Sequence, residues 1–178
     1  KGALVEAVAE GGFAVLNADD ENAIAMAERT KQRIVTFGHV NDADYRVVEL
    51  GLGDSGTMEL AIRSAHGTHR LSTKLMGIHF WPSVAAAFAV AVENGIAPET
   101  IAETLKDIET GYNRCQPYEI ENGPTFIIDT VKAPLATLPK AFEVIRPLRA
   151  PRKRIVLGML ADHPGDSNTA YKKAYRWA

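Results

Sequence analysis

The chain has 178 residues, of which 46% are hydrophobic, and its 20 Lys and Arg residues nearly balance 22 Asp and Glu residues for a net charge of −2. This composition is typical of a globular protein of one domain or two small lobes, and it excludes a disordered chain. The near-neutral charge excludes the basic surface that nucleic acid or an anionic membrane requires.

Cysteine content and hydropathy indicate the cellular location of the chain and whether it spans a membrane. Cys115 is the only cysteine, which excludes a disulfide framework and a cysteine-based zinc site and predicts a reducing, cytoplasmic location. The longest apolar run, near residues 80–92, is interrupted by Pro82 and Ser83 and is shorter than the roughly 20 residues that span a bilayer. We therefore expect no membrane span.

The first 37 residues predict a strand, a helix and a strand in a parallel crossover. In chain order we expect a helix that begins at or before residue 1 and ends at Gly11 and Gly12, a strand over 13–16, a helix over about 21–29 and a strand over 33–37. Residues 13–16 are all apolar, which is typical of a strand buried on both faces. Asp19 or Asp20 is the expected N-cap of the following helix.

Period-two alternation between residues 45 and 76 predicts an antiparallel region attached to the parallel strands, with a turn at residues 64–67. An Ala-rich helix over 81–92, ended by Asn94 and Gly95, comes next. Pro98 suits the first position of another helix. Three side chains of that helix are expected to face inward, namely Ile101, Leu105 and Ile108.

A second unit is expected from about residue 111. Asn122-Gly123, between apolar runs at 118–120 and 125–128, is a strong hairpin signal, and Asp129 follows at the carboxyl end of a strand. The remaining elements are expected to be a helix over about 135–145, a basic linker over 149–154, a strand over 155–157 and a helix from about 168. Because this unit closes no sheet by itself, and because the first helix begins at residue 1 or earlier, we expect the chain to be a piece of a longer one.

Glycine-rich and histidine motifs define no site by themselves. The chain has no GxxxxGK[ST] phosphate loop, and the glycine-rich segment 51–57 lacks the lysine and precedes an antiparallel strand, so we interpret it as a loop. The histidines lack the i, i+4 spacing of a helical metal pair. Four are expected to be surface or loop residues, namely His39, His66, His69 and His163. His79 differs because it lies between Gly77 and the start of a helix.

Asp129, Lys132 and Arg114 are candidate ligand-binding residues. Ligands of open α/β sheets bind beyond the carboxyl ends of strands, where a carboxylate can accept hydrogen bonds from ribose hydroxyls or hold a metal-bound water. Lys132 could neutralise phosphoryl charge, and Arg114 could supply a planar fork to phosphate. The equally supported alternative is structural, with Asp129 as a helix N-cap and the two basic residues as solvated side chains.

Several short motifs, taken in order, resemble those of the Mur ligases, the ATP-dependent amide-forming enzymes of peptidoglycan assembly. The motifs are KGAL at residues 1–4, AVLNADD at 14–20, GIH at 77–79, NR at 113–114, ID at 128–129 and IVLGML at 155–160. The segment LGMLAD at 157–162 is most similar to the D-alanyl-D-alanine-adding branch. Enzymes similar to cyanophycin synthetase or folylpolyglutamate synthase are the other relatives that the motifs resemble.

The resemblance implies an α/β fold in two parts. Residues 1–109 would be the latter half of a P-loop-type central ATPase domain with an antiparallel hairpin region. Residues 110–178 would be part of a Rossmann-like C-terminal domain. The phosphate loop, further metal ligands and the substrate-binding domain would lie upstream, so the 178 residues by themselves are expected to be inactive.

The resemblance also implies roles for residues of the first part. Lys1 falls where the family has a carbamylated lysine that helps to hold Mg²⁺, so Lys1 is expected to be a metal ligand and a catalytic residue. His79 matches a histidine of the family's His-Asn-x-x-Asn motif, in which Phe80 and Ser83 replace both asparagines. His79 and Ser83 are therefore the expected cofactor-binding positions.

In the second part, Arg114 and Asp129 match residues that contact the nucleotide. Lys132 lies near a basic or asparagine position of the family and is expected to be catalytic, although the TVKAP run at 130–134 departs from the family's usual sequence.

The function implied is that of an ATP- and Mg²⁺-dependent ligase that joins a carboxylate to the amine of an amino acid or dipeptide through an acyl phosphate. Its partners would be these small molecules and the rest of the same polypeptide, with no nucleic acid. The alternative is a non-catalytic relative that binds a nucleotide or a partner subunit, which the loss of both asparagines favours. A third, weaker alternative is a complete flavodoxin-like binding domain.

Overall fold

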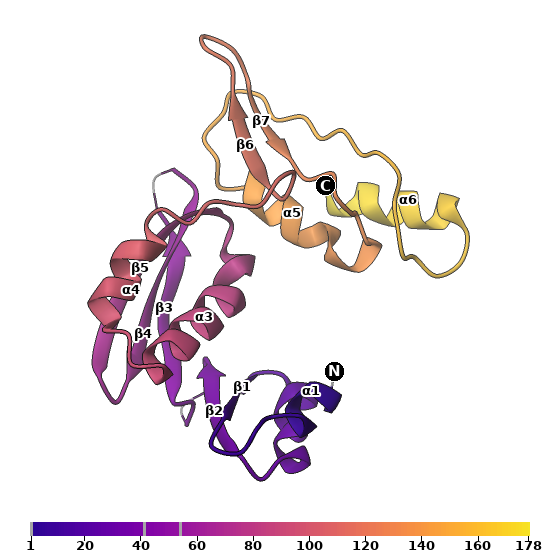
Figure 1. Cartoon of the computed structure of the whole chain (residues 1–178). Helices are drawn as coiled ribbons and strands as arrows, with labels where there is room; N and C mark the ends of the chain where they lie inside the picture. The colour runs from indigo at the N-terminus through magenta and orange to yellow at the C-terminus, as the bar shows by residue number, and fades with distance from the viewer. Residues whose placement is uncertain (1, 41, 54) are drawn as a thin grey trace. The chain divides into compact units, whose positions relative to one another are not determined.

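The computed structural model describes residues 2–40, 42–53 and 55–178. Its contacts divide the chain into two units (Figure 1). Unit 1 comprises residues 1–51, 59–73 and 80–107, and unit 2 comprises residues 52–58, 74–79 and 108–178. Helices and strands occur in both units, which confirms the predicted α/β class.

A parallel pair of strands begins unit 1. The elements here are α1 (Gly2–Glu6), β1 (Phe13–Asn17), α2 (Glu21–Ile24), the 3-10 helix η1 (Ala25–Arg29) and β2 (Arg33–Gly38). β1 and β2 pair in parallel with Val15 opposite Val35, which confirms the predicted crossover. α1 and η1 cover the face of β1 that carries Ala14 and Leu16. Asp20 caps α2 by accepting hydrogen bonds from the backbone N–H groups of two following residues, as predicted.

Three details of this region differ from the prediction. α1 ends at Glu6, and the chain reaches Gly11, whose φ is +77°, through turns and not through further helix. β1 is not buried on both faces, because Phe13 and Val15 are half-buried. The predicted helix over 21–29 changes to a 3-10 helix at Ala25.

Asp19 joins the loops that follow β1 and β2. Its carboxylate accepts hydrogen bonds from the backbone N–H groups of His39 at 2.9 Å and Val40 at 3.2 Å. Gly38 permits this approach, since a Cβ atom there would lie 2.7 Å from Oδ1 of Asp19. The Asp19 carboxylate, in the loop after β1, therefore satisfies two amides of the loop after β2.

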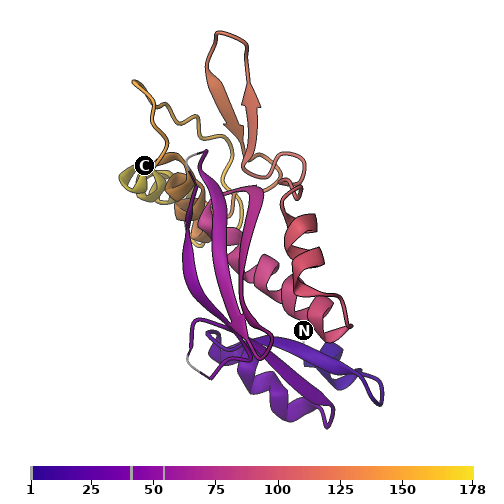
Figure 2. The ribbon, with the colours of Figure 1, turned by 90° about the vertical axis from the view of Figure 1, so that its left-hand side faces the viewer.

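Three long strands continue the sheet, namely β3 (Tyr45–Leu52), β4 (Thr57–Ser64) and β5 (Gly67–Met76). The strand order is β1-β2-β3-β4-β5, with β3 parallel to β2. Only two residues connect β4 to β5, so these neighbours are antiparallel, as predicted. Figure 2 shows α3 (Trp81–Glu93) and α4 (Pro98–Leu105) on one face of the long strands.

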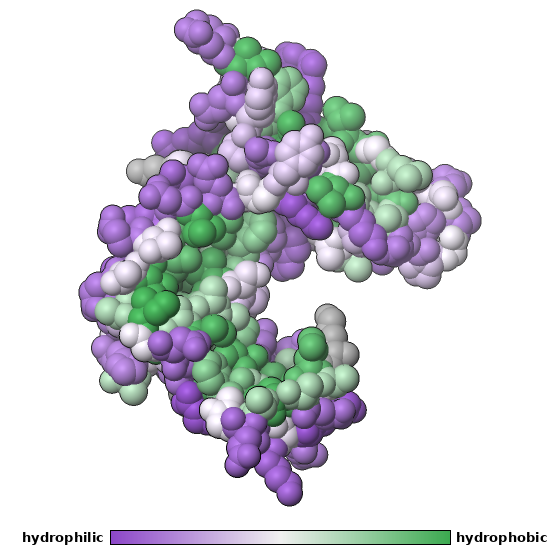
Figure 3. Space-filling view, in the orientation of Figure 1, coloured by the Kyte–Doolittle hydropathy of each residue, from purple (hydrophilic) through white to green (hydrophobic). Residues whose placement is uncertain are grey.

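α3 supplies much of the core of unit 1. The side chain of Phe88 is fully buried, and its ring centroid lies 6.1 Å from that of Tyr45 and 5.9 Å from that of His69. At the other end of the helix, Trp81 packs edge-on against Phe37 of β2. Hydrophobic surface is visible over α3 and α4 in Figure 3.

α4 begins at Pro98, as predicted, and buries Ile101 and Leu105. The prediction that Ile108 faces inward is wrong, because α4 ends at Leu105 and the side chain of Ile108 is 41% exposed. No helix of the described residues is both long enough and apolar enough to cross a membrane.

Glu93, at the end of α3, links that helix to the sheet. It forms an ion pair with Arg33 of β2, and the hydroxyl of Tyr45 donates a hydrogen bond to its Oε1 at 2.9 Å. The bond from Arg33, followed by that from Tyr45, lowers the pKa of Glu93 against the opposing effect of burial. Burial and the Glu93 carboxylate raise the pKa of Tyr45, so its hydroxyl stays a donor.

We expect Glu93 to make stability depend on pH in acid. Since its pKa is lower in the folded chain than the ordinary 4.5, its bonds stabilise the fold above that value, and this stabilisation is lost as the pH falls towards the folded-state pKa. Glu93→Gln should therefore flatten the pH dependence of urea unfolding between about pH 3 and about pH 6. Glu10→Gln, a change at an exposed carboxylate, is the control, and an equal slope in both variants would contradict the assignment.

Unit 2 contains an antiparallel hairpin of β6 (Gln116–Glu119) and β7 (Thr125–Ile128). The register places Tyr118 opposite Phe126. Asn122 has a φ of +55° in the connecting loop, so the predicted hairpin is confirmed.

The helical part of unit 2 has a small core. Its elements are the 3-10 helix η3 (Leu135–Thr137), α5 (Leu138–Ile145) and α6 (Ser167–Trp177). They bury six residues together, namely Leu135, Leu138, Phe142, Leu160, Ala170 and Ala174. Asp166 caps α6 with hydrogen bonds from the side chain and backbone of Thr169, which lower the pKa of Asp166.

Residues 155–157 do not form the predicted strand. In the part of the chain that the structure describes, no strand lies beside them, and the side chain of Val156 is 96% exposed. A parallel bridge forms only further on, between Ala161 and Pro134. The apolar sequence is suitable for a strand, but a strand also requires a hydrogen-bonded neighbour.

Candidate functional site

The end of β5 packs closely within unit 2. Gly77 has a φ of +95°, and a Cβ atom there would lie 2.5 Å from Cγ2 of Val144 in α5. Gly56 has a φ of +78°, and a Cβ atom there would lie 2.8 Å from Cδ2 of Leu148. Only glycine suits both the backbone conformation and the spacing at these positions. This close packing fixes the position of the backbone from which the next element begins, the 3-10 helix η2 (Ile78–Phe80).

His79 lies half-buried in η2. Burial lowers its pKa, and the charge of Lys140 adds to the shift, whereas Asp129 and Glu143 oppose it. The imidazole is therefore neutral at pH 7 and offers one hydrogen-bond donor and one acceptor. The charges that act on His79 thus come from Asp129, just after β7, and from two residues of α5.

Arg114 stands in a strained turn just before β6. Its neighbours Asn113 and Cys115 have φ values of +54° and +47°, a conformation that residues other than glycine rarely adopt. Three hydrogen bonds hold the turn. They run from Arg114 N to Gly111 O at 3.0 Å, from Asn113 N to Oε1 of Gln116 at 3.1 Å and from Thr130 N to Asn113 O at 3.0 Å. The turn therefore fixes the backbone of Arg114, whose side chain is exposed.

Asp129 follows β7 directly and lies across from Cys115. The ladder pairs Gln116 with Ile128, so the next residues beyond this pair, Cys115 and Asp129, oppose one another. Cys115 is buried, and burial together with the nearby Asp129 carboxylate raises the pKa of the thiol to about 12. The thiol is therefore protonated at neutral pH.

The structural alternative for Asp129 is wrong, because the residues that precede η3 and α5 are Pro134 and Thr137. The reasoning from an open parallel sheet does not apply either. Within the described residues, β7 pairs with β6 in a sheet of two antiparallel strands.

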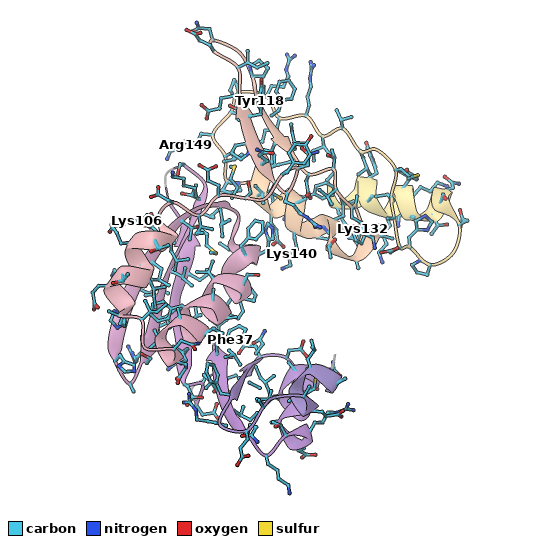
Figure 4. All side chains as sticks on the ribbon, in the orientation of Figure 1. Phe37, Lys106, Tyr118, Lys132, Lys140 and Arg149 are labelled. Atoms are coloured by element: carbon cyan, nitrogen blue, oxygen red, sulfur yellow. The ribbon has the colours of Figure 1, made fainter. Side chains whose placement is uncertain are left out.

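Lys132 forms an ion pair with Asp162, whose φ is +47°. Both side chains are more than half exposed. Lys132 and Lys140, labelled in Figure 4, come from different segments of unit 2, and it is Lys140 whose charge acts on His79. The ion-pair partner of Lys132 could not be predicted from neighbouring residues, because Asp162 lies far from Lys132 in the sequence.

Of the predicted site residues, His79, Arg114 and Asp129 lie in unit 2, where the Asp129 carboxylate acts electrostatically on His79. Ser83 is exposed in the first turn of α3 in unit 1. Lys1 lies outside the described residues. Sequence analysis did not predict that Cys115 lies opposite Asp129, although a hairpin centred on Asn122 already places residue 115 almost opposite residue 129.

These side chains fit a nucleotide but supply no metal site of their own. The guanidinium of Arg114 suits phosphate, and the Asp129 carboxylate suits ribose hydroxyls. Across residues 2–40, 42–53 and 55–178, no group of three or more His, Cys, Asp or Glu residues could hold a metal ion.

A five-stranded mixed sheet, and helices and strands in both units, define the chain as an α/β protein. Residues 1–91, half of the chain, match the family model described as the Mur ligase middle domain. The chain belongs to the Mur ligase family.

Two curated relatives illustrate the similarity. A UDP-N-acetylmuramoyl-L-alanyl-D-glutamate–2,6-diaminopimelate ligase of Geobacillus kaustophilus is 29% identical over 150 residues, which cover 84% of this chain and 30% of the relative. A UDP-N-acetylmuramate–L-alanine ligase of Paenarthrobacter aurescens is 37% identical over 98 residues, which cover 53% of this chain and 20% of the relative. The chain thus spans less than a third of the length of either enzyme.

Solved structures show the same fold. MurF from Acinetobacter baumannii has a TM-score of 0.75 at 20% identity, over 84% of this chain and 32% of that chain. MurF ligase from Thermotoga maritima in complex with ADP has a TM-score of 0.70 at 16% identity, over 93% of this chain and 38% of that chain. The relatives come from different branches of the family, so the assignment to the D-alanyl-D-alanine-adding branch stays a prediction.

Proposed function

We propose that this chain is part of an ATP-dependent ligase that joins a small carboxylate to an amine in the synthesis of peptidoglycan precursors. Membership of the Mur ligase family carries the proposal, and the placement of Arg114, Asp129 and His79 in unit 2 supports it. The Thermotoga maritima relative was solved with ADP, which supports ATP as the nucleotide.

In the proposed reaction, a carboxylate oxygen attacks the terminal phosphorus of ATP and ADP leaves, which gives an acyl phosphate. The amine then attacks the acyl carbon, phosphate leaves, and the amine loses a proton as the amide forms. Arg114 would bind phosphate oxygens, and Asp129 would accept hydrogen bonds from ribose hydroxyls. The neutral imidazole of His79 would hydrogen-bond to the base.

Magnesium and a carbamylated Lys1 stay predictions. Mg²⁺ held by carbamate oxygens would neutralise phosphate charge. Ser83 as a cofactor-binding residue and Lys132 as a catalytic residue also stay predictions, as do the domain boundaries 1–109 and 110–178 and the cytoplasmic location.

The second candidate function is a non-catalytic relative that binds nucleotide or a partner subunit. The replacement of both asparagines of the His-Asn-x-x-Asn motif by Phe80 and Ser83 favours it. Only the ligase predicts turnover, whereas the binding protein predicts binding of nucleotide or of a partner subunit without turnover.

One experiment separates the two candidates. The complete polypeptide that contains these residues is incubated with Mg-ATP, UDP-linked muramic acid acceptors and candidate amines, and both phosphate release and amide product are measured. Phosphate release that requires acceptor and amine together is the expected result. Nucleotide binding in calorimetry without turnover for any pair would contradict the ligase and support the binding protein.

A further inference from the structure

The segment at residues 152–160 connects α5 to α6 in unit 2, and among the residues that the structure describes no strand pairs with it (Figure 1). We propose that the polypeptide that follows Ala178 in the complete protein adds a parallel strand along this segment and fills the apolar groove beside it. The reaction described above does not use this surface. The inference rests on the proposed function only because both take the chain to be part of a longer polypeptide.

A groove of about 650 Å³ lies beside the segment. Its walls come from α5, from α6 and from the segment itself, and they are mainly apolar or aromatic. They include Phe142 and Ile145 of α5, Ile155 and Leu157 of the segment and Tyr175 of α6. Ile155 is 39% exposed and Tyr175 is 84% exposed, so apolar surface here faces water. Such a surface marks a place where another element packs.

At its carboxyl end, the segment directs backbone groups to two different edges. Ala161 N donates a hydrogen bond to Ala133 O at 2.9 Å, and Ala161 O accepts one from Leu135 N at 3.2 Å. One edge therefore faces the chain around the start of η3. Since successive residues of an extended chain direct their backbone groups to opposite edges, Gly158 O and Leu160 N point to the other edge.

The hydroxyl of Tyr171, in α6, takes the place of a strand neighbour on this other edge. It donates a hydrogen bond to Gly158 O at 2.9 Å and accepts one from Leu160 N at 3.2 Å. A residue of a parallel neighbouring strand makes the same two bonds, to one C=O group and to the N–H group two residues further on. Val156 directs its backbone groups to this edge as well, and no described residue bonds to them. The edge is therefore ready to accept a parallel strand.

Contacts at the end of α6 set the direction of the added strand. Nη2 of Arg146 donates a hydrogen bond to Trp177 O at 3.2 Å, and Nζ of Lys153 donates one to Arg146 O at 2.7 Å. The last turn of α6 therefore lies near the start of the segment, and Ala178 itself lines the groove. A chain that continues from Ala178 enters the groove at the amino end of the segment and runs parallel to it, which is the connection of a strand-helix-strand unit.

The length of the relatives leaves chain for such a strand. This chain spans less than a third of either curated relative described above, and a strand needs only about five or six residues. A second copy of the chain is the other possible occupant, but it would have to bring a strand edge from outside. The chain after Ala178 already starts at the groove.

Photo-crosslinking in the complete polypeptide identifies what covers the segment. The substitution is Val156→p-benzoylphenylalanine, at a side chain that is 96% exposed in the structure. A mixture of unlabelled and isotope-labelled chains is irradiated, and mass spectrometry identifies the crosslinked peptides. We expect crosslinks within one chain, to a peptide that follows residue 178. Crosslinks only to a second copy, to another protein or to a peptide that precedes residue 1 would overturn the proposal.

Hydrogen exchange of the wild-type complete polypeptide tests the pairing without a bulky substitution. Between residues 153 and 159, no backbone N–H group donates a hydrogen bond to a described residue. An added strand would protect alternate amides here. After correction for intrinsic rates, we expect the amide of Val156 to exchange at least roughly 100-fold more slowly than that of Asn122 in the hairpin loop. Equal rates at the two positions exclude the strand.

Val156→Asp tests whether the side chain is covered in the complete polypeptide. A buried, unpaired carboxylate is costly, so we expect the melting temperature to fall by roughly 5 °C or more. Val131→Asp is the matched control, since Val131 lies in a loop of the same unit and is 51% exposed. We expect the control to shift the melting temperature by less than about 2 °C. Equal small shifts in both variants show that position 156 stays uncovered and overturn the proposal.

These measurements are independent of the ligase assay, because none of them uses nucleotide or substrate. A complete polypeptide without turnover that still protects the Val156 amide contradicts the proposed function and supports the added strand. A polypeptide with turnover in which this amide exchanges freely supports the proposed function and overturns the strand.

Discussion

Arg114→Ala is expected to lower kcat/KM for ATP in the complete polypeptide by about 10²- to 10³-fold, the effect of removing one preorganised group that stabilises transition-state charge. Backbone hydrogen bonds and two positive φ angles fix the turn that holds Arg114. We therefore expect no neighbouring side chain to take the place of its guanidinium. Steady-state kinetics at varied ATP concentration measure the effect.

Two further variants sharpen the test. Arg114→Lys should recover only part of the loss, because an ammonium group lacks the planar pair of donors. Arg149→Ala, in the exposed basic linker and labelled in Figure 4, removes an equal charge and should leave kcat/KM unchanged. If Arg114→Ala and Arg149→Ala behave alike, Arg114 has no role in nucleotide binding.

The largest expected loss of stability is that of Phe88→Ala. The Phe88 side chain is fully buried between α3 and the sheet, in contact with the rings of Tyr45 and His69. Truncation removes these contacts and leaves a cavity, which should lower the free energy of unfolding by about 3–5 kcal/mol and the melting temperature by roughly 10 °C.

Val90→Ala is the matched control, since Val90 lies in the same helix but is 42% exposed. We expect this change to alter stability by less than about 0.5 kcal/mol. Circular dichroism during thermal and urea unfolding measures both variants. A Phe88→Ala protein as stable as the control would show that α3 does not pack on the sheet through this residue.

Elements with a complete local signal were predicted correctly. The capping carboxylate of Asp20, the Asn122 hairpin and the start of α4 at Pro98 each depend on a few neighbouring residues, and the structure confirms all three. Residues 155–157 and Ile108 failed for the opposite reason. These residues are apolar, but they are buried only if a neighbouring strand or a longer helix is present. Neither of these is determined by the local sequence.

The candidate site follows the same division. Arg114 and Asp129 were predicted from short sequence motifs, and their roles stay predictions. The ion pair of Lys132 with Asp162 and the packing of Gly77 on Val144 depend instead on segments far apart in the chain. Cys115 stands between these cases. Its register against Asp129 can be counted from the hairpin, but the depth of its burial cannot.

Asp19 has a consequence for how unit 1 moves. By binding the amides of His39 and Val40, one side chain from the loop after β1 holds the loop after β2, and the lack of a side chain at Gly38 makes room for it. These bonds tie two surface loops to each other, so we expect a change in the position of either loop to shift the other.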